Sequence, residues 1–338
     1  MTHSSPSQWL RATPAGIEVL PGGFTIDPVR PVDRAVITHG HGDHARPGHA
    51  AVLATAPTLA IMEERFGPQA RAQPAAYGEQ IKIGDVSLRL EPAGHVLGSA
   101  QIVIEYGGSR VVVSGDYKRR RDPTCPPFVP IACDVFITEA TFALPVFCHP
   151  DDRGEIAKLL HSLRLFPERT HLVGVYALGK AQRVIMLLRE AGYGAPIFIH
   201  GALRGLCGLY ERFGIDLGEL ASIEGRSTES LKGQIVLCPP AALADRWSRR
   251  LADPVAGMAS GWMRIRQRAK QRGVELPLVI SDHADWNELL QTVREVTPQE
   301  VWITHGREEA FAHALGTMGI PARALSLVGY EDEDEETS

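Results

Sequence analysis

The sequence has few cysteines and no long apolar run. Its 338 residues include five cysteines, an odd number, and no two of them are spaced as Cys-x-x-Cys. A disulfide framework or a cysteine-bound zinc knuckle is therefore not expected, and buried thiols in a reducing compartment fit better. No apolar stretch approaches the ~20 residues that a membrane span needs, and the N-terminus has no apolar signal segment. We therefore expect a cytoplasmic protein with no membrane partner.

The chain also lacks a large excess of either charge. Its 35 Lys and Arg residues against 40 Asp and Glu residues give a net charge of −5. Six of the acidic residues lie in the last eight positions, EDEDEETS, so 34 remain against 35 basic residues over 1–330. The body of the chain is therefore neutral, and we expect residues 331–338 to be a disordered acidic tail. The length is that of roughly two domains.

The hydrophobic pattern changes along the chain. Alternating apolar residues predict strands over 17–26, 34–38, 81–90, 101–105 and 110–114, as in an antiparallel sheet. From about residue 151, helices over 153–165, 180–191 and 202–213 alternate with strands over 171–175 and 196–199, which indicates a second, parallel sheet. Further strands are expected over 234–237, 276–281 and 300–304, and further helices over 242–251, 285–296 and 308–318.

A histidine-rich loop directly follows the apolar strand at 35–38. Over positions 39–44 it reads His-Gly-His-Gly-Asp-His, which places four ligand-type side chains within six residues. Alternate residues at a strand end point the same way, so His39 and His41 can hold one metal ion while the turn directs Asp43 and His44 to a second. Imidazole and carboxylate suit a divalent metal.

More candidate ligands stand where later strands end. His95 lies in a Gly-His-Val-Leu-Gly-Ser segment, Asp116 in Ser-Gly-Asp after the strand at 110–113, and His305 in Thr-His-Gly. Functional groups often lie at such switches from strand to loop. Together with the histidine-rich loop, these residues predict a dinuclear metal site.

This set of motifs resembles the metallo-β-lactamase fold. The segments Thr138-Glu139-Ala140-Thr141 and Ser281-Asp282-His283-Ala284-Asp285, separated by a long α/β insertion, are similar to the β-CASP nucleases. Within that group, the motifs around Asp27, at 176–183 and at 260–263 are most similar to the bacterial ligase-associated DNA exonucleases. The resemblance implies an α/β protein, an αββα sandwich (1–145 and 256–330) with an inserted β-CASP cap (146–255).

The resemblance also implies a role for each matching residue. One metal ion would be held by His39, His41 and His95, the other by Asp43, His44 and His305, with Asp116 bridging them. Asp27 would orient the histidine-rich loop from behind, and Glu139 and His283 would act beside the metals. The ions are expected to be Zn²⁺, although such ligands also accept Mn²⁺. The catalytic set that the resemblance implies is Asp43, Glu139 and His283.

Basic residues near these motifs are candidates for binding phosphate. Lys118, Arg119, Arg120 and Arg121 closely follow Asp116, and Lys180 and Arg183 open a predicted helix whose N-terminus could hold a phosphate. A solvated surface turn remains an alternative for the first group. A second basic cluster, at 264–272, alternates as on a strand edge or in an irregular loop, and Tyr176 and Trp262 are candidates for stacking on bases.

Two metal ions at such a site could activate a water and clamp a phosphodiester for in-line hydrolysis. We therefore expect a DNA exonuclease that acts in repair, in functional association with an ATP-dependent DNA ligase and a helicase, with digestion from 5′ ends of single strands favoured. The main alternative is a ribonuclease of RNA processing, because His305 stands where Artemis-type members tend to have an apolar residue. A thioester or lactam hydrolase and a non-catalytic scaffold are the remaining alternatives.

Overall fold

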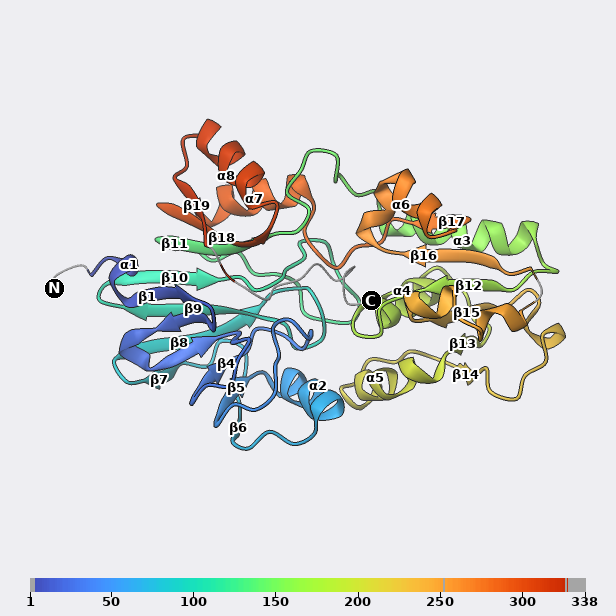
Figure 1. The fold of residues 1–338 in the computed structure, drawn as a ribbon, viewed down its shortest axis with the longest axis horizontal. Helices are drawn as coiled ribbons and strands as arrows, with labels where there is room; N and C mark the ends of the chain where they lie inside the picture. The colour runs from blue at the N-terminus through green and yellow to red at the C-terminus, as the bar shows by residue number, and fades with distance from the viewer. Residues whose placement is uncertain (1–3, 252, 326, 328–338) are drawn as a thin grey trace. The chain divides into compact units, whose positions relative to one another are not determined.

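The computed structural model describes residues 4–251, 253–325 and 327, and the chain divides into two compact units (Figure 1). The sandwich unit comprises the chain up to Phe147 and again from His283, and the inserted unit runs from Cys148 to Asp282. The return to the sandwich unit thus lies later than the expected position 256, because the strands Val255–Ala259 and Leu276–Leu278 pair into the sheet of the inserted unit. The acidic tail at 331–338 lies outside the described residues.

Two sheets form the sandwich unit. The first, in the order β1 to β6, begins antiparallel and becomes parallel from β3 onward. The second has the order β19-β18-β11-β10-β9-β8-β7, with β7 to β10 antiparallel and β10, β11, β18 and β19 parallel. The first sheet contains β1 (Leu10–Thr13), β2 (Gly16–Val19), β3 (Phe24–Ile26), β4 (Ala35–Val36), β5 (Val52–Ala54) and β6 (Ala72–Pro74). The second contains β7 (Ile81–Ile83), β8 (Val86–Pro92), β9 (Ala100–Tyr106), β10 (Ser109–Val113), β11 (Val135–Ala140), β18 (Glu300–Gly306) and β19 (Ala322–Ala324).

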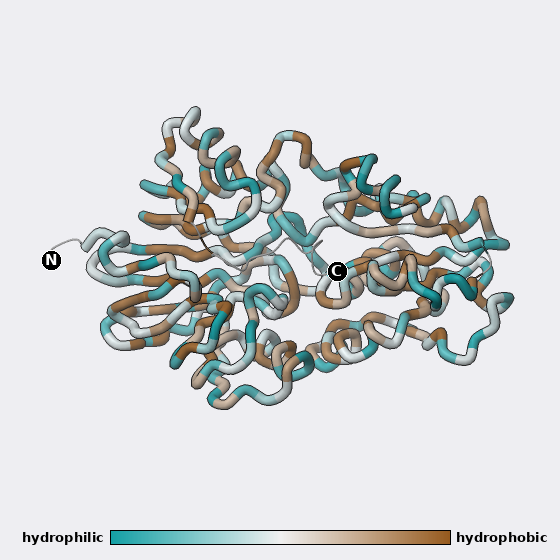
Figure 2. The backbone as a smooth tube through the Cα atoms, in the orientation of Figure 1, coloured by the Kyte–Doolittle hydropathy of each residue, from teal (hydrophilic) through white to brown (hydrophobic). Residues whose placement is uncertain are grey.

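The period of two along the strands gives the second sheet two apolar faces. Ile102 and Ile104 of β9 belong to a core cluster shared with strands of the first sheet, whereas Val103 between them packs into a cluster with helix residues. Apolar residues are accordingly concentrated in the strands (Figure 2). The helices of this unit are α1 (Pro6–Trp9), α2 (Ala56–Phe66), α7 (Trp286–Val296) and α8 (Glu308–Thr317), with a 3-10 turn η1 (Leu20–Gly22).

The helices cover the outer faces of the sheets. Leu289 of α7 and Phe311 of α8 pack against the outer face of the second sheet. Leu59 and Met62 of α2 pack against β4 and β5 of the first sheet. The result is the expected αββα arrangement, a helix–sheet–sheet–helix sandwich.

The inserted unit is built on a parallel sheet in the order β14-β13-β15-β12-β16-β17, confirming the alternating pattern of the sequence. Its strands are β12 (His171–Gly174), β13 (Ile197–Ile199), β14 (Leu220–Ser222), β15 (Ile235–Cys238), β16 (Val255–Ala259) and β17 (Leu276–Leu278). Its helices are α3 (Asp152–Leu165), α4 (Lys180–Glu190), α5 (Gly201–Arg212) and α6 (Arg266–Gln271), with 3-10 turns η2 (Glu229–Leu231), η3 (Pro240–Leu243), η4 (Ser248–Arg250) and η5 (Gly261–Arg264).

Several expected elements differ in the structure. The strand expected over 17–26 is broken by η1, where the segment Leu-Pro-Gly-Gly turns the chain between β2 and β3. The helix expected over 242–251 is replaced by η3 and η4, and the Ser248 hydroxyl binds the Leu243 and Asp245 carbonyls that a continuous helix would use. The basic segment expected as a strand edge or loop contains helix α6. Sequence patterning also missed α2 and β16.

Candidate metal centre and active site

The histidine-rich loop follows β4 and is almost fully buried. His39, His41 and His44 have exposed fractions of 0, 8 and 2%. Gly40 allows this close packing, because a Cβ at that position would lie 2.5 Å from Cγ2 of Ile61 in α2. The loop is therefore pressed against α2, and its side chains are directed by packing rather than left in solvent.

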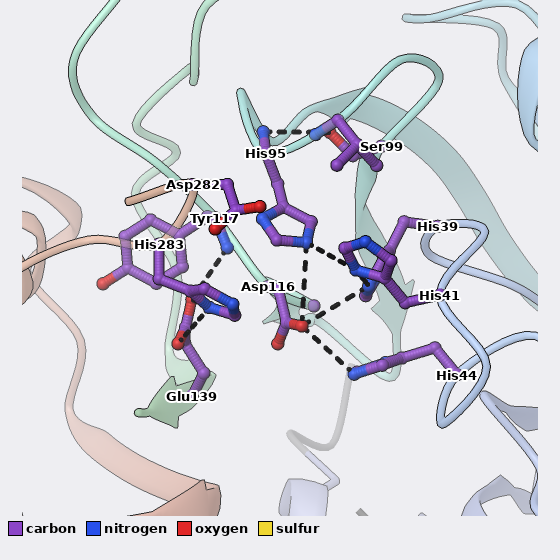
Figure 3. Close-up of polar contacts among 12 residues, drawn as sticks. His39, His41, His44, His95, Ser99, Asp116, Tyr117, Glu139, Asp282 and His283 are labelled. Carbon is purple, nitrogen blue, oxygen red and sulfur yellow. Dashed lines mark hydrogen bonds and ion pairs between the residues drawn. The ribbon is translucent and has the colours of Figure 1, made fainter. Parts of the chain in front are cut away.

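The first ligand group contains the side chains expected to hold one metal ion (Figure 3). The Nδ1 atom of His41 lies 3.1 Å from Nε2 of His39 and 3.0 Å from Nε2 of His95. Oδ2 of Asp116 lies 3.4 Å from Nε2 of His39 and 3.8 Å from Nε2 of His95. Three imidazole nitrogens and one carboxylate oxygen thus converge on one point.

The second group lies on the other side of the same carboxylate. Nε2 of His44 is 3.5 Å from Oδ2 of Asp43 and 3.4 Å from Oδ2 of Asp116. Nε2 of His305, near the end of β18, is 3.1 Å from Oδ1 of Asp116. Asp116 therefore contacts both groups, as a bridging ligand must, and the structure brings together all seven residues expected as ligands.

The spacing of these atoms fits a metal ion. Ligand atoms about 2.0–2.1 Å from a tetrahedral zinc ion lie about 3.3–3.4 Å from one another. The four separations given above for the first group, 3.0 to 3.8 Å, bracket that value. A cluster of imidazoles and carboxylates that meet in a buried space is the donor set of a divalent metal rather than of a hydrophobic core.

The pKa shifts within the cluster differ from residue to residue, and the carboxylate of Asp116 raises the pKa values of His44 and His305 against the effect of burial. Burial lowers the pKa of His39 well below its usual value, which favours the neutral imidazole that a metal requires. Burial alone would raise the pKa of Asp116, but the contacts with His44, His305 and His39 lower it well below its usual range. Asp116, the candidate bridging residue, is therefore held as a carboxylate.

Asp27 lies behind the loop, in the position expected for an orienting carboxylate. Its Oδ2 atom is 2.8 Å from Nδ1 of His44 and accepts the Thr38 hydroxyl at 2.6 Å, while its Oδ1 atom accepts the Thr38 backbone N–H at 2.8 Å. Asp27 has a positive φ of 42° and is 3% exposed. A carboxylate that binds the far nitrogen of a ligand histidine fixes the direction of the ring.

His283 and Glu139 form a pair next to the first group. Nδ1 of His283 lies 2.9 Å from Oε2 and 3.1 Å from Oε1 of Glu139. The His283 ring lies 4.7 Å from the His95 ring, centroid to centroid, and Glu139 also accepts the backbone N–H of Tyr117. The residue that caps the N-terminus of α7 is Asp285, two residues after His283, which forms a capping box with Glu288. His283 is therefore not the capping residue of this helix.

The basic residues after Asp116 are mostly engaged within the sandwich unit. Arg119 pairs with Glu295 at 2.5 Å, and Arg120 contacts both Asp285 and Glu288 of α7. Lys118 is 2% exposed. The cations expected to bind phosphate after Asp116 are thus largely paired with acidic residues of α7 and with its N-cap residue, Asp285. Phosphate binding by Lys118 and Arg119 stays a prediction.

Lys180 and Arg183 lie in the first turn of α4, as expected, but both are buried. Lys180 pairs with Asp282 at 2.5 Å and donates to the Ile280 carbonyl, and Arg183 pairs with Asp152. Binding a phosphate would require these side chains to leave buried ion pairs, which costs free energy. Trp262 is 4% exposed and is covered by the Arg268 guanidinium, 4.0 Å from its ring centroid, so it is not presented as an open stacking surface.

Sequence reasoning missed the groups that support the ligands from behind. Thr38 contacts Nδ1 of His39, Thr304 contacts Nδ1 of His305, and the Tyr117 backbone holds Glu139. The first two carry a sequence signal, a threonine directly before a ligand histidine. A backbone contact such as that of Tyr117 has no signature in the residue type.

Comparisons with known proteins agree with this architecture. Residues 278–325 match the family described as RMMBL, Zn-dependent metallo-hydrolase RNA specificity domain. A probable DNA ligase of Opitutus terrae is 29% identical over 309 residues, covering 90% of this chain and 30% of that protein. Ribonuclease TTHA0252 of Thermus thermophilus is 29% identical over 222 residues, covering 56% of this chain and 51% of that protein. The chain thus spans between about a third and a half of these curated relatives.

A solved structure shares the fold. The crystal structure of a protein of unknown function from Enterococcus faecalis V583 superposes with a TM-score of 0.58 at 13% identity, covering 88% of this chain and 80% of that one. The αββα sandwich with a His and Asp cluster at its strand ends defines a metallo-β-lactamase-type metallo-hydrolase fold. With its inserted α/β unit and these relatives, the chain is similar to the β-CASP group of the metallo-β-lactamase superfamily. No helix among the described residues is long and apolar enough to cross a membrane.

Proposed function

We propose that the chain is a metal-dependent DNA exonuclease that hydrolyses phosphodiester bonds from 5′ ends of single-stranded DNA during repair. The observation that carries this proposal is the placement of Asp116 between two groups of ligand atoms, with the His283–Glu139 pair beside the first group. Each part of a two-metal hydrolytic site is thus supplied by this chain's own residues.

The residues divide the chemistry between them. Divalent ions bound here, Zn²⁺ or Mn²⁺, would supply an activated water and Lewis-acid stabilisation of the phosphodiester. Glu139 accepts Nδ1–H of His283, and its carboxylate would stabilise the imidazolium form of that ring. In that doubly protonated form His283 would donate the proton on Nε2 to the leaving oxygen and become the neutral imidazole. Asp43 and Asp116 would supply the negative charge that balances the bound cations, because both are carboxylates within the ligand groups.

The choice of DNA is supported by the relative that covers most of this chain, the probable DNA ligase, which is matched over 90% of the chain. A nuclease segment in a ligase polypeptide would prepare ends for sealing, which fits the expected association with an ATP-dependent ligase and a helicase. The 5′ polarity rests on the resemblance to Artemis-type exonucleases.

A second candidate is a ribonuclease of RNA processing. It is supported by the matched family description at residues 278–325, by the Thermus ribonuclease, and by His305, which contacts Asp116. The same metal chemistry serves both candidates, because the scissile group is a phosphodiester in DNA and in RNA.

A labelled-strand assay distinguishes the candidates. Matched DNA and RNA single strands, labelled at the 5′ or the 3′ end, are incubated with the protein and Zn²⁺ or Mn²⁺, with and without a chelator. We expect chelator-sensitive release of nucleotides from the 5′ end of DNA, and no activity in Asp43→Ala or Asp116→Ala. Asp85→Ala, an exposed carboxylate between β7 and β8, is the matched control. Faster turnover of RNA favours the second candidate, and activity that survives in both variants contradicts the two-metal site.

A further inference from the structure

The tripeptide Thr-His-Gly occurs twice in the sandwich unit, at 38–40 and at 304–306. Its histidines, His39 and His305, belong to different ligand groups, and both present Nε2 to Asp116. A ring that binds metal through Nε2 must carry its proton on Nδ1, so something has to fix that tautomer. In both places the hydroxyl of the preceding threonine lies within hydrogen-bond distance of Nδ1 of the histidine.

The Thr38 hydroxyl has its single proton committed elsewhere. It donates to Oδ2 of Asp27 at 2.6 Å, and an ionised carboxylate can only accept. The hydroxyl oxygen lies 3.0 Å from Nδ1 of His39, so this contact requires the imidazole to donate Nδ1–H. Because Oδ2 of Asp27 also lies 2.8 Å from Nδ1 of His44, one carboxylate sets two rings, His44 directly and His39 through Thr38.

Packing holds Thr38 in this position. The side chain is 1% exposed, and a Cβ added at Gly115 would lie 2.7 Å from its Cβ and 2.9 Å from its Oγ1. Gly115, whose φ is +56°, directly precedes Asp116. The loop that carries Asp116 therefore packs closely against Thr38, the residue in contact with Nδ1 of His39.

Thr304 repeats the arrangement with a different acceptor. Its hydroxyl donates to the Thr138 carbonyl at 3.2 Å and lies 2.9 Å from Nδ1 of His305. A backbone carbonyl, like the carboxylate, can only accept, so His305 must again donate Nδ1–H. Successive residues of a regular strand face opposite ways, but the pairing of β11 with β18 is irregular here, because its register shifts between Thr138 and Ala140.

We propose that Thr38 and Thr304 are positioning residues that fix the Nε2-binding tautomers of His39 and His305, one in each ligand group. This inference rests on the proposed metal centre. The Thr170-His171 pair in the inserted unit provides the contrast: the buried Thr170 hydroxyl donates to the Leu231 carbonyl, and the His171 ring bonds to Ser162 through Nε2.

Zinc affinity tests the proposal without an activity assay. Metal-free full-length protein is titrated with zinc against a chromogenic chelator, for the wild type, Thr38→Val, Thr304→Val, Thr38→Ser and Thr304→Ser. Valine keeps the shape of threonine but removes the hydroxyl, so we expect each valine variant to bind one of its two zinc ions about 10- to 100-fold more weakly. The serine variants should restore wild-type affinity, and Thr170→Val, the matched control, should not change it.

A second readout addresses the tautomer itself. In ¹⁵N-histidine spectra of the zinc-loaded wild type, His39 and His305 should each carry the proton on Nδ1, and the valine variants should lose that signature for the ring next to the substitution. Valine variants that bind zinc as tightly as the wild type overturn the proposal, and so do serine variants as weak as the valine ones. A wild type that binds no zinc overturns the metal centre instead.

Discussion

His283 and Glu139 lie at 2.9 Å, Nδ1 to Oε2, and come from segments separated by the entire inserted unit. Glu139 is in β11 and is fully buried, while His283 immediately follows the inserted unit and is 5% exposed. The insertion therefore separates the two partners in the sequence without separating them in space, and both halves of the sandwich unit are needed to form the pair.

Removing His283 should impair turnover without emptying the metal site. For His283→Ala we expect kcat to fall about 10²- to 10⁴-fold, the usual contribution of a positioned proton donor. Glu139→Gln keeps an oxygen that can accept from Nδ1 and should lose less activity than Glu139→Ala. The measurements are single-strand hydrolysis and zinc content by elemental analysis. Loss of bound zinc in His283→Ala would contradict its role as a proton donor and identify it as a ligand.

Gly306, directly after His305, should not tolerate a side chain. Its φ is +98°, and a Cβ there would lie 2.3 Å from the carbonyl carbon of Ala140, a backbone atom that cannot rotate away. We expect Gly306→Ala to lower the free energy of unfolding by more than the about 1–3 kcal/mol of backbone strain and to weaken one zinc site, because His305 moves with it. Urea unfolding and zinc titration measure these effects.

Gly319 supplies the control for that substitution. Its φ is +75°, but open space surrounds the position of the added Cβ. Gly319→Ala should therefore cost only the left-handed backbone penalty, about 1–2 kcal/mol, and leave zinc binding unchanged. Equal losses of stability in the two variants would show that the contact with Ala140 relaxes.

Lys180 should contribute to stability rather than to phosphate binding. Its ammonium and the Asp282 carboxylate are each 2% exposed, so Lys180→Ala leaves a buried carboxylate without its cation, at a cost of about 3–5 kcal/mol in the free energy of unfolding. Lys158→Ala, which removes the half-exposed partner of Glu155, should cost about 0–1 kcal/mol. Urea unfolding compares the two variants. A Lys180→Ala protein with unchanged stability and weakened DNA affinity would instead support the phosphate contact predicted from the sequence.

The grouping of the candidate metal ligands could be predicted from the sequence because its signal is local. His39, His41, Asp43 and His44 lie within six residues at a strand end, and the direction of strand-end side chains follows from the backbone period. The αββα class came from the resemblance carried by these motifs. The continuous apolar run Ile102, Val103 and Ile104 agrees with it, because its side chains pack on both faces of the second sheet.

The state of the basic residues could not be predicted in this way. Arg119 pairs with Glu295, 176 positions away, and Arg183 with Asp152, 31 positions away. The sequence shows how many cationic side chains a segment has. It does not show which of them form ion pairs with residues that are distant in the chain. The boundary of the inserted unit failed for a related reason, because the pairing of β16 with β12 is a contact between distant segments.

Arg266 and Lys270 are cations that the fold leaves exposed. They lie one turn apart on the same face of α6, and the described residues offer neither side chain an ion pair. If a polyanion crosses this face, the double variant Arg266→Ala/Lys270→Ala should bind single-stranded DNA more weakly at low salt, and the slope of log K against log salt should become shallower by about 1–2. The double variant Arg71→Ala/Lys82→Ala removes two exposed cations from the sandwich unit and serves as the control. Equal salt slopes for the wild type and the α6 variant, measured by fluorescence anisotropy, would rule out contact between this face and the phosphate backbone.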